Sequence, residues 1–263
     1  MATPVVFVHG LWLHASSWQP WMELFREAGY EPTAPGWPGI PDTIPEARQH
    51  PEQIPPAGTR EVADHYAKII GTLPAKPIVV GHSFGGLVVQ NLLTRGLAAA
   101  AVAIDPAPIK GVLVLPPSAL RMASIALRNP ANRNRAVSLT REEFRWGFGN
   151  ALTEPESNEL YDRWSIPTPG RPLFEAAFAA LVPNSPAKVD TRTDRGPLLL
   201  TAGLRDRTVP PAVVRSTRKL YHRSHGITDY REFTGRGHTL TVDSGWREVA
   251  DTALAWLKER SVA

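Results

Sequence analysis

A glycine-rich turn between an expected strand and an expected helix constrains the fold of this chain most. Gly81-His82-Ser83-Phe84-Gly85 follows the apolar run Pro77 to Val80 and precedes a helical pattern from about Gly86 to Arg95. Glycines two positions before and after the serine allow a turn so tight that a Cβ would clash there. A turn of this kind lifts the serine hydroxyl above the end of the strand. The sequence therefore predicts a strand, a sharp turn that presents Ser83, and a helix.

Short apolar runs alternate with amphipathic helical patterns over most of the chain, which predicts an α/β fold with a mostly parallel sheet covered by helices on both faces. A run such as Val5 to Val8 has no polar alternation and is typical of a buried parallel strand. The other expected strands are Tyr30–Ala34, Ile78–Val80, Ala101–Ile104, Leu198–Leu200 and about 228–233, and the expected helices contain Trp18 to Phe25, Val62 to Ile70, 86–95, 210–220 and Val249 to Leu257.

The alternation stops between about residues 110 and 195, where helices and loops are expected without a convincing strand. Thr140 with Glu143, and Thr153 with Glu156, have the spacing of a helix capping box. We expect a helical cap at 110–195, inserted into a core formed by 1–109 and 196–263. The stretch from Pro35 to Gly58 is rich in proline and glycine, which predicts a long loop over the end of the sheet.

Composition narrows the function classes. The 263 residues include no cysteine, which excludes disulfides and thiolate chemistry, and the formal charge is only +4 with scattered basic residues. We therefore expect no nucleic-acid partner. No apolar stretch is long enough for a signal sequence or a membrane span, so a cytoplasmic protein without a membrane partner is expected. No residue pattern predicts a metal or an organic cofactor, and the oligomeric state is left open.

A serine hydroxyl needs a base to become a nucleophile, and His238 is the best candidate among eight histidines. It lies in Gly235-Arg236-Gly237-His238-Thr239, directly after the last expected strand. In a parallel sheet this loop is at the same carboxyl edge as Ser83. His222 and His225 precede that strand and are expected at the opposite edge.

The base in turn needs an acid that fixes its tautomer and stabilises the imidazolium. Asp206 follows the expected strand Leu198–Thr201 and gives the chain order serine, acid, histidine. Asp105, at the end of the preceding strand, is the competing candidate. Arg205 and Arg207 flank Asp206 and would favour its ionised form, although they also suit ordinary surface positions.

Two backbone N–H groups are needed to bind an oxyanion, one of them from the residue after the nucleophile. Phe84 provides the first. The loop His9-Gly10-Leu11-Trp12, after the first expected strand, provides the second, with Leu11 as the expected donor and Trp12 as the alternative. His9 is expected to have a structural role.

These features together resemble the α/β-hydrolase fold superfamily of serine esterases and lipases. The resemblance rests on His9-Gly10, on the turn Gly81 to Gly86 and on the Asp206 and His238 loops, and it covers nearly the whole chain. It implies a sheet of about six strands without the usual first hairpin. The segment from His9 to Gly29 is also similar to small plant-type methylesterases and hydroxynitrile lyases.

The resemblance implies a serine hydrolase that cleaves a carboxylic ester or lactone through an acyl-enzyme at Ser83. The inserted segment is rich in aromatic residues, so an apolar or aromatic substrate moiety is expected under the cap. Two alternative functions remain, because a fold does not determine the reaction. One is a lyase or C–C bond hydrolase that uses the same triad, and the other is a ligand receptor of the same fold with slow turnover. The expected pocket residues are Trp12, His14, Trp37, Phe144 and Trp164.

Overall fold

The centre of the molecule is a six-stranded parallel sheet with the strand order β2-β1-β3-β4-β7-β8. The structure, a computed structural model, describes residues 2–262. Apart from β2 and β8, which form the two edges, the strands are completely buried, as their unbroken apolar runs require. The predicted α/β fold with a mostly parallel sheet of about six strands is confirmed. The strands are β1 (Pro4–Val8), β2 (Glu31–Thr33), β3 (Ile78–His82), β4 (Ala100–Ile104), β7 (Leu198–Gly203) and β8 (Thr228–Phe233).

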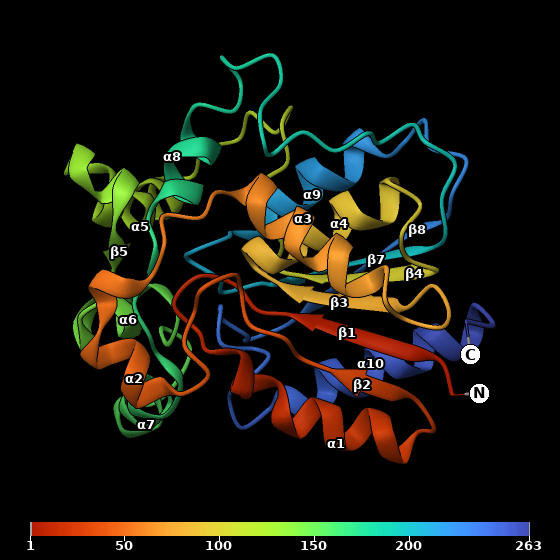
Figure 1. The fold of residues 1–263 in the computed structure, drawn as a ribbon, viewed down its shortest axis with the longest axis horizontal. Coiled ribbons are helices and arrows are strands. Elements are labelled where there is room, and N and C mark those ends of the chain that lie inside the picture. The colour runs from red at the N-terminus through yellow and green to blue at the C-terminus, as the bar shows by residue number, and fades with distance from the viewer. Residues whose placement is uncertain (1, 263) are drawn as a thin grey trace.

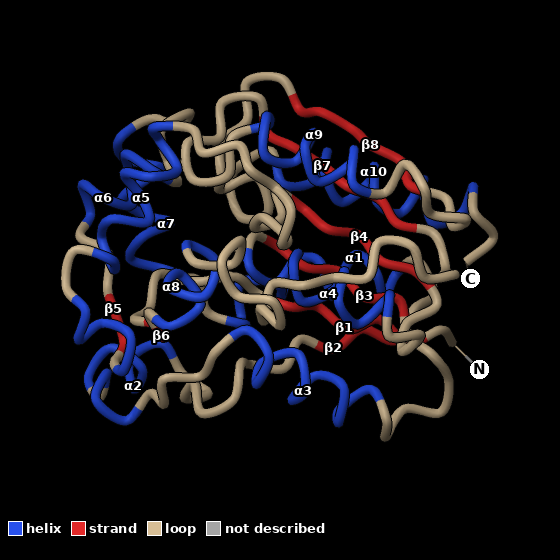
Figure 2. Tube along the Cα trace, turned by 90° about the horizontal axis from the view of Figure 1, so that it is seen from above, coloured by secondary structure: helices blue, strands red, loops and turns tan. Residues whose placement is uncertain are grey.

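Helices cover both faces of the sheet (Figure 1). On one face α1 (Gln19–Glu27) and α10 (Trp246–Glu259) share a hydrophobic core with the side chains of that face, and Trp21 and Phe25 are completely buried there. On the other face α3 (Thr59–Ile70), α4 (Phe84–Thr94) and α9 (Pro211–Leu220) form the second core. Figure 2 shows the same layers from above. Both cores hold the strands rigidly, so that their carboxyl ends can position a site.

The helices of the segment 110–195 lie at the carboxyl ends of the strands, on the left in Figure 1, and the last part of the segment runs along the top of the view to the start of β7. Thr140 caps its helix with the expected reciprocal capping box to Glu143. The segment also contains a pair of two-residue antiparallel strands, which no local pattern predicted because their pairing joins residues far apart in the chain. Its elements are α5 (Pro117–Leu127), the 3₁₀ turn η3 (Pro130–Asn134), β5 (Ala136–Val137), α6 (Arg141–Gly147), α7 (Glu154–Trp164), β6 (Thr168–Pro169) and α8 (Arg171–Ala177).

The stretch 35–58, predicted as a loop, contains the short helix α2 (Ile44–Gln49) and the turn η2 (Pro51–Gln53). Thr43 caps α2 by accepting a hydrogen bond from the backbone N–H of Glu46. Arg48 of α2 donates to the carbonyl oxygens of Tyr161 and Ser165. This stretch therefore fastens the 110–195 segment to the core.

The first helical segment begins differently from the prediction. A 3₁₀ turn, η1 (Ala15–Trp18), precedes α1, and the N-cap residue of this turn is His14. The ring of His14 accepts a hydrogen bond from the backbone N–H of Ser16 at 3.1 Å. A histidine in this role is uncommon, because capping by short polar side chains is the rule.

None of the helices in residues 2–262 combines the length and the apolar composition that crossing a membrane requires.

Candidate active site

Ser83 lies in a strained turn between β3 and α4, with backbone angles φ 56° and ψ −122°. The backbone around it is packed without room for side chains. A Cβ on Gly85 would collide with the carbonyl oxygen of Val8, and a Cβ on Gly81 would collide with the carbonyl oxygen of Gly85. Side chains at either position would push α4 away from the sheet. The predicted turn is therefore present, and its glycines are required by close backbone approach.

His238 and Asp206 meet at the carboxyl edge of the sheet, in the loops after β8 and β7. His238 Nδ1 donates to Asp206 Oδ2 at 2.5 Å, and both side chains are completely buried. The other oxygen of Asp206 accepts the backbone N–H groups of Thr208 and Val209 at 2.7 and 2.8 Å. The carboxylate is thereby fixed on both sides. With the proton on Nδ1, Nε2 of His238 has the free lone pair that a general base needs.

Burial determines the protonation of this pair. It lowers the pKa of His238 to about 4 and raises the pKa of Asp206 to about 7, because the charged form of each group loses its hydration. The two N–H groups of Thr208 and Val209 act in the opposite direction and lower the pKa of Asp206. Neutral His238 is therefore the form present at neutral pH.

Asp105, the competing acid, lies next to this pair but has a different partner. Its side chain is completely buried, and its Oδ1 accepts the backbone N–H of Gly203 at 2.9 Å. Burial and the neighbouring Asp206 raise the pKa of Asp105 well above its usual value. The structure brings His238 together with Asp206 by a hydrogen bond, whereas Asp105 stands beside them as a carboxyl group that favours its neutral form.

Asp105, Asp206 and His238 also place possible ligand atoms within 4.8 Å of one another, a spacing that a metal ion could use. Binding there would require Asp206 Oδ2 to give up its hydrogen bond to His238. It would also require access to three side chains that are at most 4% exposed. The hydrogen bonds that these groups already make fit an acid–base pair better than a metal centre.

His238 Nε2 has no hydrogen-bond partner among residues 2–262, so its bond to Ser83 is not formed in this state. The histidine ring is nevertheless close to the nucleophile turn, because its centroid lies 4.5 Å from that of His82, the residue before Ser83. Phe148 packs edge-on against the other side of the ring at 4.6 Å. Such bonds often tighten only when substrate binds.

The loop after β1 lies directly against the turn that carries Ser83. A Cβ on Gly10 would lie 2.7 Å from the Cβ of Ser83, which shows how closely this loop approaches the serine. The backbone N–H of Trp12 donates to Thr168 Oγ1 at 3.1 Å, so Trp12 is unavailable as the alternative donor. No hydrogen bond within residues 2–262 involves the N–H of Leu11 or of Phe84. Of the three expected donors, Leu11 and Phe84 therefore keep backbone N–H groups that no other described residue occupies.

His9 supports this loop from behind, as expected of a structural residue. Its Nδ1 donates to the carbonyl oxygen of Gly10 at 2.8 Å, and its Nε2 accepts the backbone N–H of Trp37 at 3.1 Å. Burial lowers the pKa of His9 to about 4, so the ring stays neutral and can make both bonds.

A cavity of about 180 Å³ opens onto Ser83 beneath the 110–195 segment. Its lining contains no charged side chain, and Ser83 and Thr208 contribute its only hydroxyl groups. An apolar group is what such a cavity can hold. The lining residues are Trp12, Ser83, Phe84, Ala107, Pro108, Leu115, Ala119, Leu120, Met122, Ala123, Leu127, Leu173, Ala176, Ala177, Thr208 and Val209.

Of the five expected pocket residues, only Trp12 lines this cavity. His14 caps η1 and donates through Nε2 to the carbonyl oxygen of Pro41. Trp37 stacks on His9, with the ring centroids 5.4 Å apart. Phe144 is completely buried against Phe148 and Tyr161. The backbone carbonyl of Trp164 accepts the N–H of His14. These four residues pack within the loops and the 110–195 segment rather than around the cavity.

The lining residues that sequence reasoning missed are aliphatic. α5 and the loop before it contribute Leu115, Leu120, Met122 and Leu127, and α8 contributes Leu173. Arg207, one of the two arginines that flank Asp206 in the sequence, points toward a different group. Its guanidinium lies over the ring of Trp146 at 5.2 Å from the ring centroid. The apolar residues of α5 recur at helical spacing, and this spacing was the signal in the sequence for an apolar helix face.

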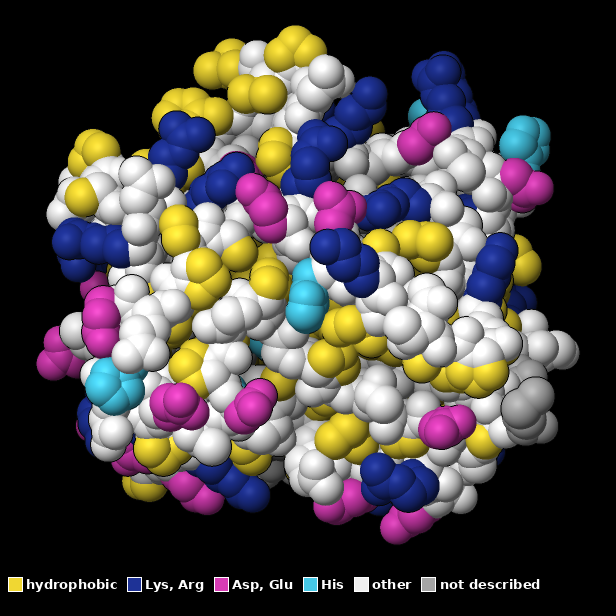
Figure 3. Space-filling view, in the orientation of Figure 1, with side chains coloured by type: hydrophobic (Ala, Val, Ile, Leu, Met, Phe, Trp, Pro, Cys, Tyr) yellow, Lys and Arg dark blue, Asp and Glu magenta, His cyan; other side chains and the backbone are white. Residues whose placement is uncertain are grey.

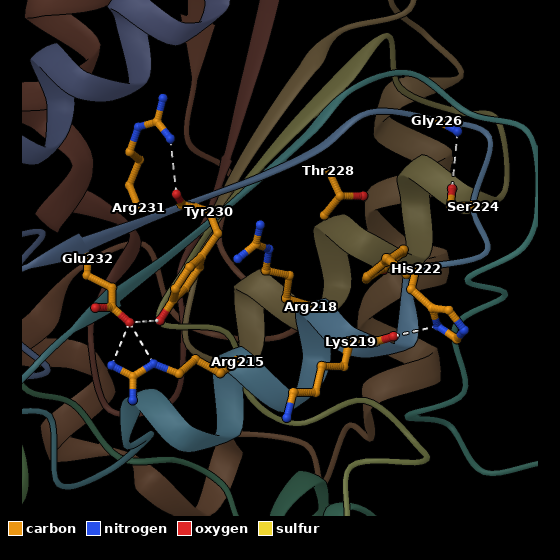
Figure 4. A pocket seen from close by; sticks show the side chains of 11 residues that line it. Arg215, Arg218, Lys219, His222, Ser224, Gly226, Thr228, Tyr230, Arg231 and Glu232 are labelled. Atoms are coloured by element: carbon orange, nitrogen blue, oxygen red, sulfur yellow. Dashed lines mark hydrogen bonds and ion pairs between the residues drawn. The ribbon is translucent and has the colours of Figure 1, made fainter.

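A larger hollow than the Ser83 cavity lies elsewhere, between α9 and β8 (Figure 4). This groove of about 950 Å³ is lined by basic side chains, among them Arg215, Arg218 and Lys219. Arg215 is paired with Glu232 at 2.7 Å. The groove contains none of the residues around Ser83, so it is separate from the candidate active site.

The profile described as "Alpha/beta hydrolase family" matches residues 5–252. Among solved structures, the monoacylglycerol lipase of Paleococcus ferrophilus is 24% identical with a TM-score of 0.70, and the match covers 99% of this chain and 97% of the lipase. A thermophilic esterase from Thermogutta terrifontis is 17% identical with a TM-score of 0.68 and coverage of 99% and 91%. An extracellular alpha/beta-hydrolase from a Paenibacillus species is 19% identical with a TM-score of 0.66 and coverage of 96% and 98%.

A search of curated protein sequences finds no match. The likenesses to solved structures show a shared fold, and the family profile covers nearly the whole chain. The chain therefore belongs to the alpha/beta hydrolase family.

Proposed function

We propose that this protein is a serine hydrolase that cleaves a carboxylic ester or lactone with an apolar moiety, through an acyl-enzyme at Ser83. The observation that carries the proposal is the buried His238–Asp206 pair, with its proton on Nδ1, at the edge of the sheet that also presents Ser83. This arrangement leaves Nε2 as a base on the side of the serine.

In the proposed reaction Ser83 Oγ attacks the carbonyl carbon while its proton moves to His238 Nε2. The oxyanion of the tetrahedral intermediate accepts hydrogen bonds from the N–H groups of Leu11 and Phe84. The C–O bond to the alcohol then breaks, and the alcohol leaves with the proton from His238. A water molecule attacks the acyl-enzyme in the same way, which releases the acid and restores Ser83.

The cavity supports an apolar substrate of modest size. Its volume of about 180 Å³ is below the roughly 300–1,000 Å³ of pockets for drug-sized ligands. A charged substrate would lose its hydration there without gaining a charged partner. The esterase and lipase named among the similar structures agree with ester chemistry, although fold likeness alone does not assign a reaction.

The test is intact-mass analysis after reaction with a fluorophosphonate, together with hydrolysis of p-nitrophenyl esters of increasing acyl length. We expect one label per wild-type chain, no label on Ser83→Ala, and ester turnover in the wild type only. His238→Ala should reduce turnover by about 10⁴-fold or more. His222→Ala is the matched control, because His222 is exposed and bonds only to its own helix end and to Arg223.

Two results would contradict the proposal. Turnover by Ser83→Ala equal to that of the wild type would remove Ser83 from the reaction. Stoichiometric labelling of Ser83 without turnover of any ester or lactone would favour a lyase, a C–C bond hydrolase or a ligand receptor on the same residues.

A further inference from the structure

The cap exposes an unusual amount of apolar surface in two short segments. Leu113, Leu115 and Leu120 are 74%, 68% and 50% exposed, and Phe178 and Leu181 are 53% and 79% exposed. We call these five residues the cap patch. Single exposed leucines are ordinary, but a group of this size on one segment of a monomer marks an interaction surface.

The two segments that carry the cap patch lie side by side. Lys110 joins them, because its backbone N–H donates to the carbonyl oxygen of Ala187 at 2.8 Å and its Nζ donates to those of Val182 and Pro183 at 2.5 and 3.0 Å. Figure 1 shows the loop before α5 and the loop after α8 at the top of the molecule, and Leu120 follows in α5 itself. Hydrophobic side chains gather at the same place in the space-filling view (Figure 3).

The cap patch is continuous with the cavity at Ser83. Leu115 and Leu120 belong to both, since each is at least half exposed and each lines the cavity. No charged side chain interrupts this lining. An apolar chain can therefore pass from the outer surface to Ser83 without crossing a charged group.

Charge on the two segments favours one kind of partner. Residues 110–128 and 176–189 contain Lys110, Arg121, Arg128 and Lys188 and no aspartate or glutamate. Arg128 is paired with Glu143 of α6 at 3.7 Å, which leaves three basic residues to give the two segments a net positive charge. Apolar side chains among basic residues suit a lipid surface that carries negative charge. A second copy of this chain would bring the same positive charges face to face, which opposes a dimer through this surface.

We propose that the cap patch rests on the surface of an anionic lipid aggregate, and that an ester with a long acyl chain leaves this surface toward Ser83, with the part of the chain that exceeds the cavity lying along Leu115 and Leu120. The proposal rests on the proposed ester hydrolysis and names its substrate class. The sequence predicted no membrane partner because no segment can span a bilayer. Peripheral contact needs no span, and the patch forms only when two distant segments come together.

The test compares the wild type with the double variant Leu113→Ser/Leu181→Ser, whose two sites do not line the cavity. Binding is measured by sedimentation with vesicles of phosphatidylcholine and phosphatidylglycerol. Turnover is measured on p-nitrophenyl butyrate in solution and on p-nitrophenyl laurate held in the same vesicles. Ile227→Ser is the matched control, because Ile227 is 50% exposed and lies before β8, outside both segments.

We expect the double variant to lose at least tenfold in vesicle binding and in laurate turnover, and to keep butyrate turnover within twofold. The control should match the wild type in all three measurements. Equal vesicle binding by wild type and double variant would overturn the proposal, as would patch-dependent dimerisation with no vesicle binding. Turnover of p-nitrophenyl butyrate distinguishes failure of the proposed lipid docking from failure of the proposed hydrolysis. Butyrate turnover without vesicle binding refutes only the lipid docking. Absence of butyrate turnover in the wild type refutes the proposed hydrolysis.

Discussion

His238 Nδ1 lies 2.5 Å from Asp206 Oδ2, with both side chains completely shielded from water. The bond fixes the imidazole tautomer with its proton away from Ser83. Because Asp206 also accepts two backbone N–H groups, its position is determined before substrate arrives. The neighbouring Asp105 lacks this connection, and the two carboxyl groups therefore have different expected roles.

Replacing each carboxyl group by an amide distinguishes these roles. We expect Asp206→Asn to reduce kcat/KM by about 10³–10⁴-fold, because the amide favours the wrong tautomer of His238. Asp105→Asn should stay within about tenfold of the wild type, because its amide oxygen can still accept the N–H of Gly203 and Asp105 favours its neutral form. Ester hydrolysis and thermal unfolding are measured on both variants. A dead Asp105→Asn with an active, folded Asp206→Asn would reverse the assignment of the acid.

The activity should depend on pH through the same pair. A neutral His238 accepts the serine proton, and an ionised Asp206 stabilises the resulting imidazolium. The pKa of His238 is lowered to about 4 and that of Asp206 is raised to about 7, so protonation of the pair on acidification removes the active form. We expect kcat/KM to be near half its full value at about pH 7, to reach its full value above that pH, and to fall further as the pH decreases toward about 4.

The measurement uses an ester whose alcohol does not titrate in this pH range, and chromatography quantifies the released alcohol. Circular dichroism at each pH distinguishes unfolding from titration. The two groups titrate as a pair, so the acid limb belongs to the pair and not to either residue alone. A kcat/KM that stayed constant down to pH 4 with folded protein would contradict the need for an ionised pair.

The backbone contact between Gly10 and Ser83 makes a further prediction. A methyl group on Gly10 would lie 2.7 Å from Ser83 Cβ and 2.9 Å from the carbonyl oxygen of His82, which is too close. Gly10→Ala should displace the Leu11 loop and reduce kcat by about 10²-fold or more, the usual loss when one oxyanion donor is misplaced.

Gly96→Ala is the control for this substitution. Gly96 has φ +72° and no neighbouring atom within 4 Å of a Cβ, so alanine there should cost about 1–2 kcal/mol of stability from the backbone alone. Its kcat should match that of the wild type. Normal turnover by a folded Gly10→Ala would show that this loop does not supply a donor.

Local patterns were sufficient to predict the sheet and the positions of Ser83, Asp206 and His238 at its carboxyl edge. Each of these residues follows the carboxyl end of a strand in a parallel sheet, so topology alone brings them to one edge. The turn at Ser83 carries its own signal, because glycine is required where a Cβ would collide with backbone.

The cavity could not be predicted in the same way. Phe144 and Trp164 are large aromatic residues of the kind expected to line a pocket, but Phe144 stacks on Phe148 within the 110–195 segment. The direction of an apolar side chain on a cap helix depends on what packs above it, which the helix sequence does not contain. Similarly, the φ of +65° at Trp12 and its bond to Thr168 arise from contacts between distant segments.

The size of the cavity should limit the length of the acyl chain that the protein accepts. Ala123 of α5 lines the cavity, and a phenyl ring at this position would fill much of its volume of about 180 Å³. Each buried methylene is worth about 0.8 kcal/mol, or about fourfold in kcat/KM. Ala123→Phe should therefore shorten the preferred acyl chain, with a loss in kcat/KM of about tenfold or more on the longest p-nitrophenyl ester that the wild type hydrolyses well and less than about threefold on the acetate.

Ser124→Phe is the control, because Ser124 is exposed on the same helix. A parallel loss on all esters, or the same shift in Ser124→Phe, would mean that the acyl chain does not occupy this cavity.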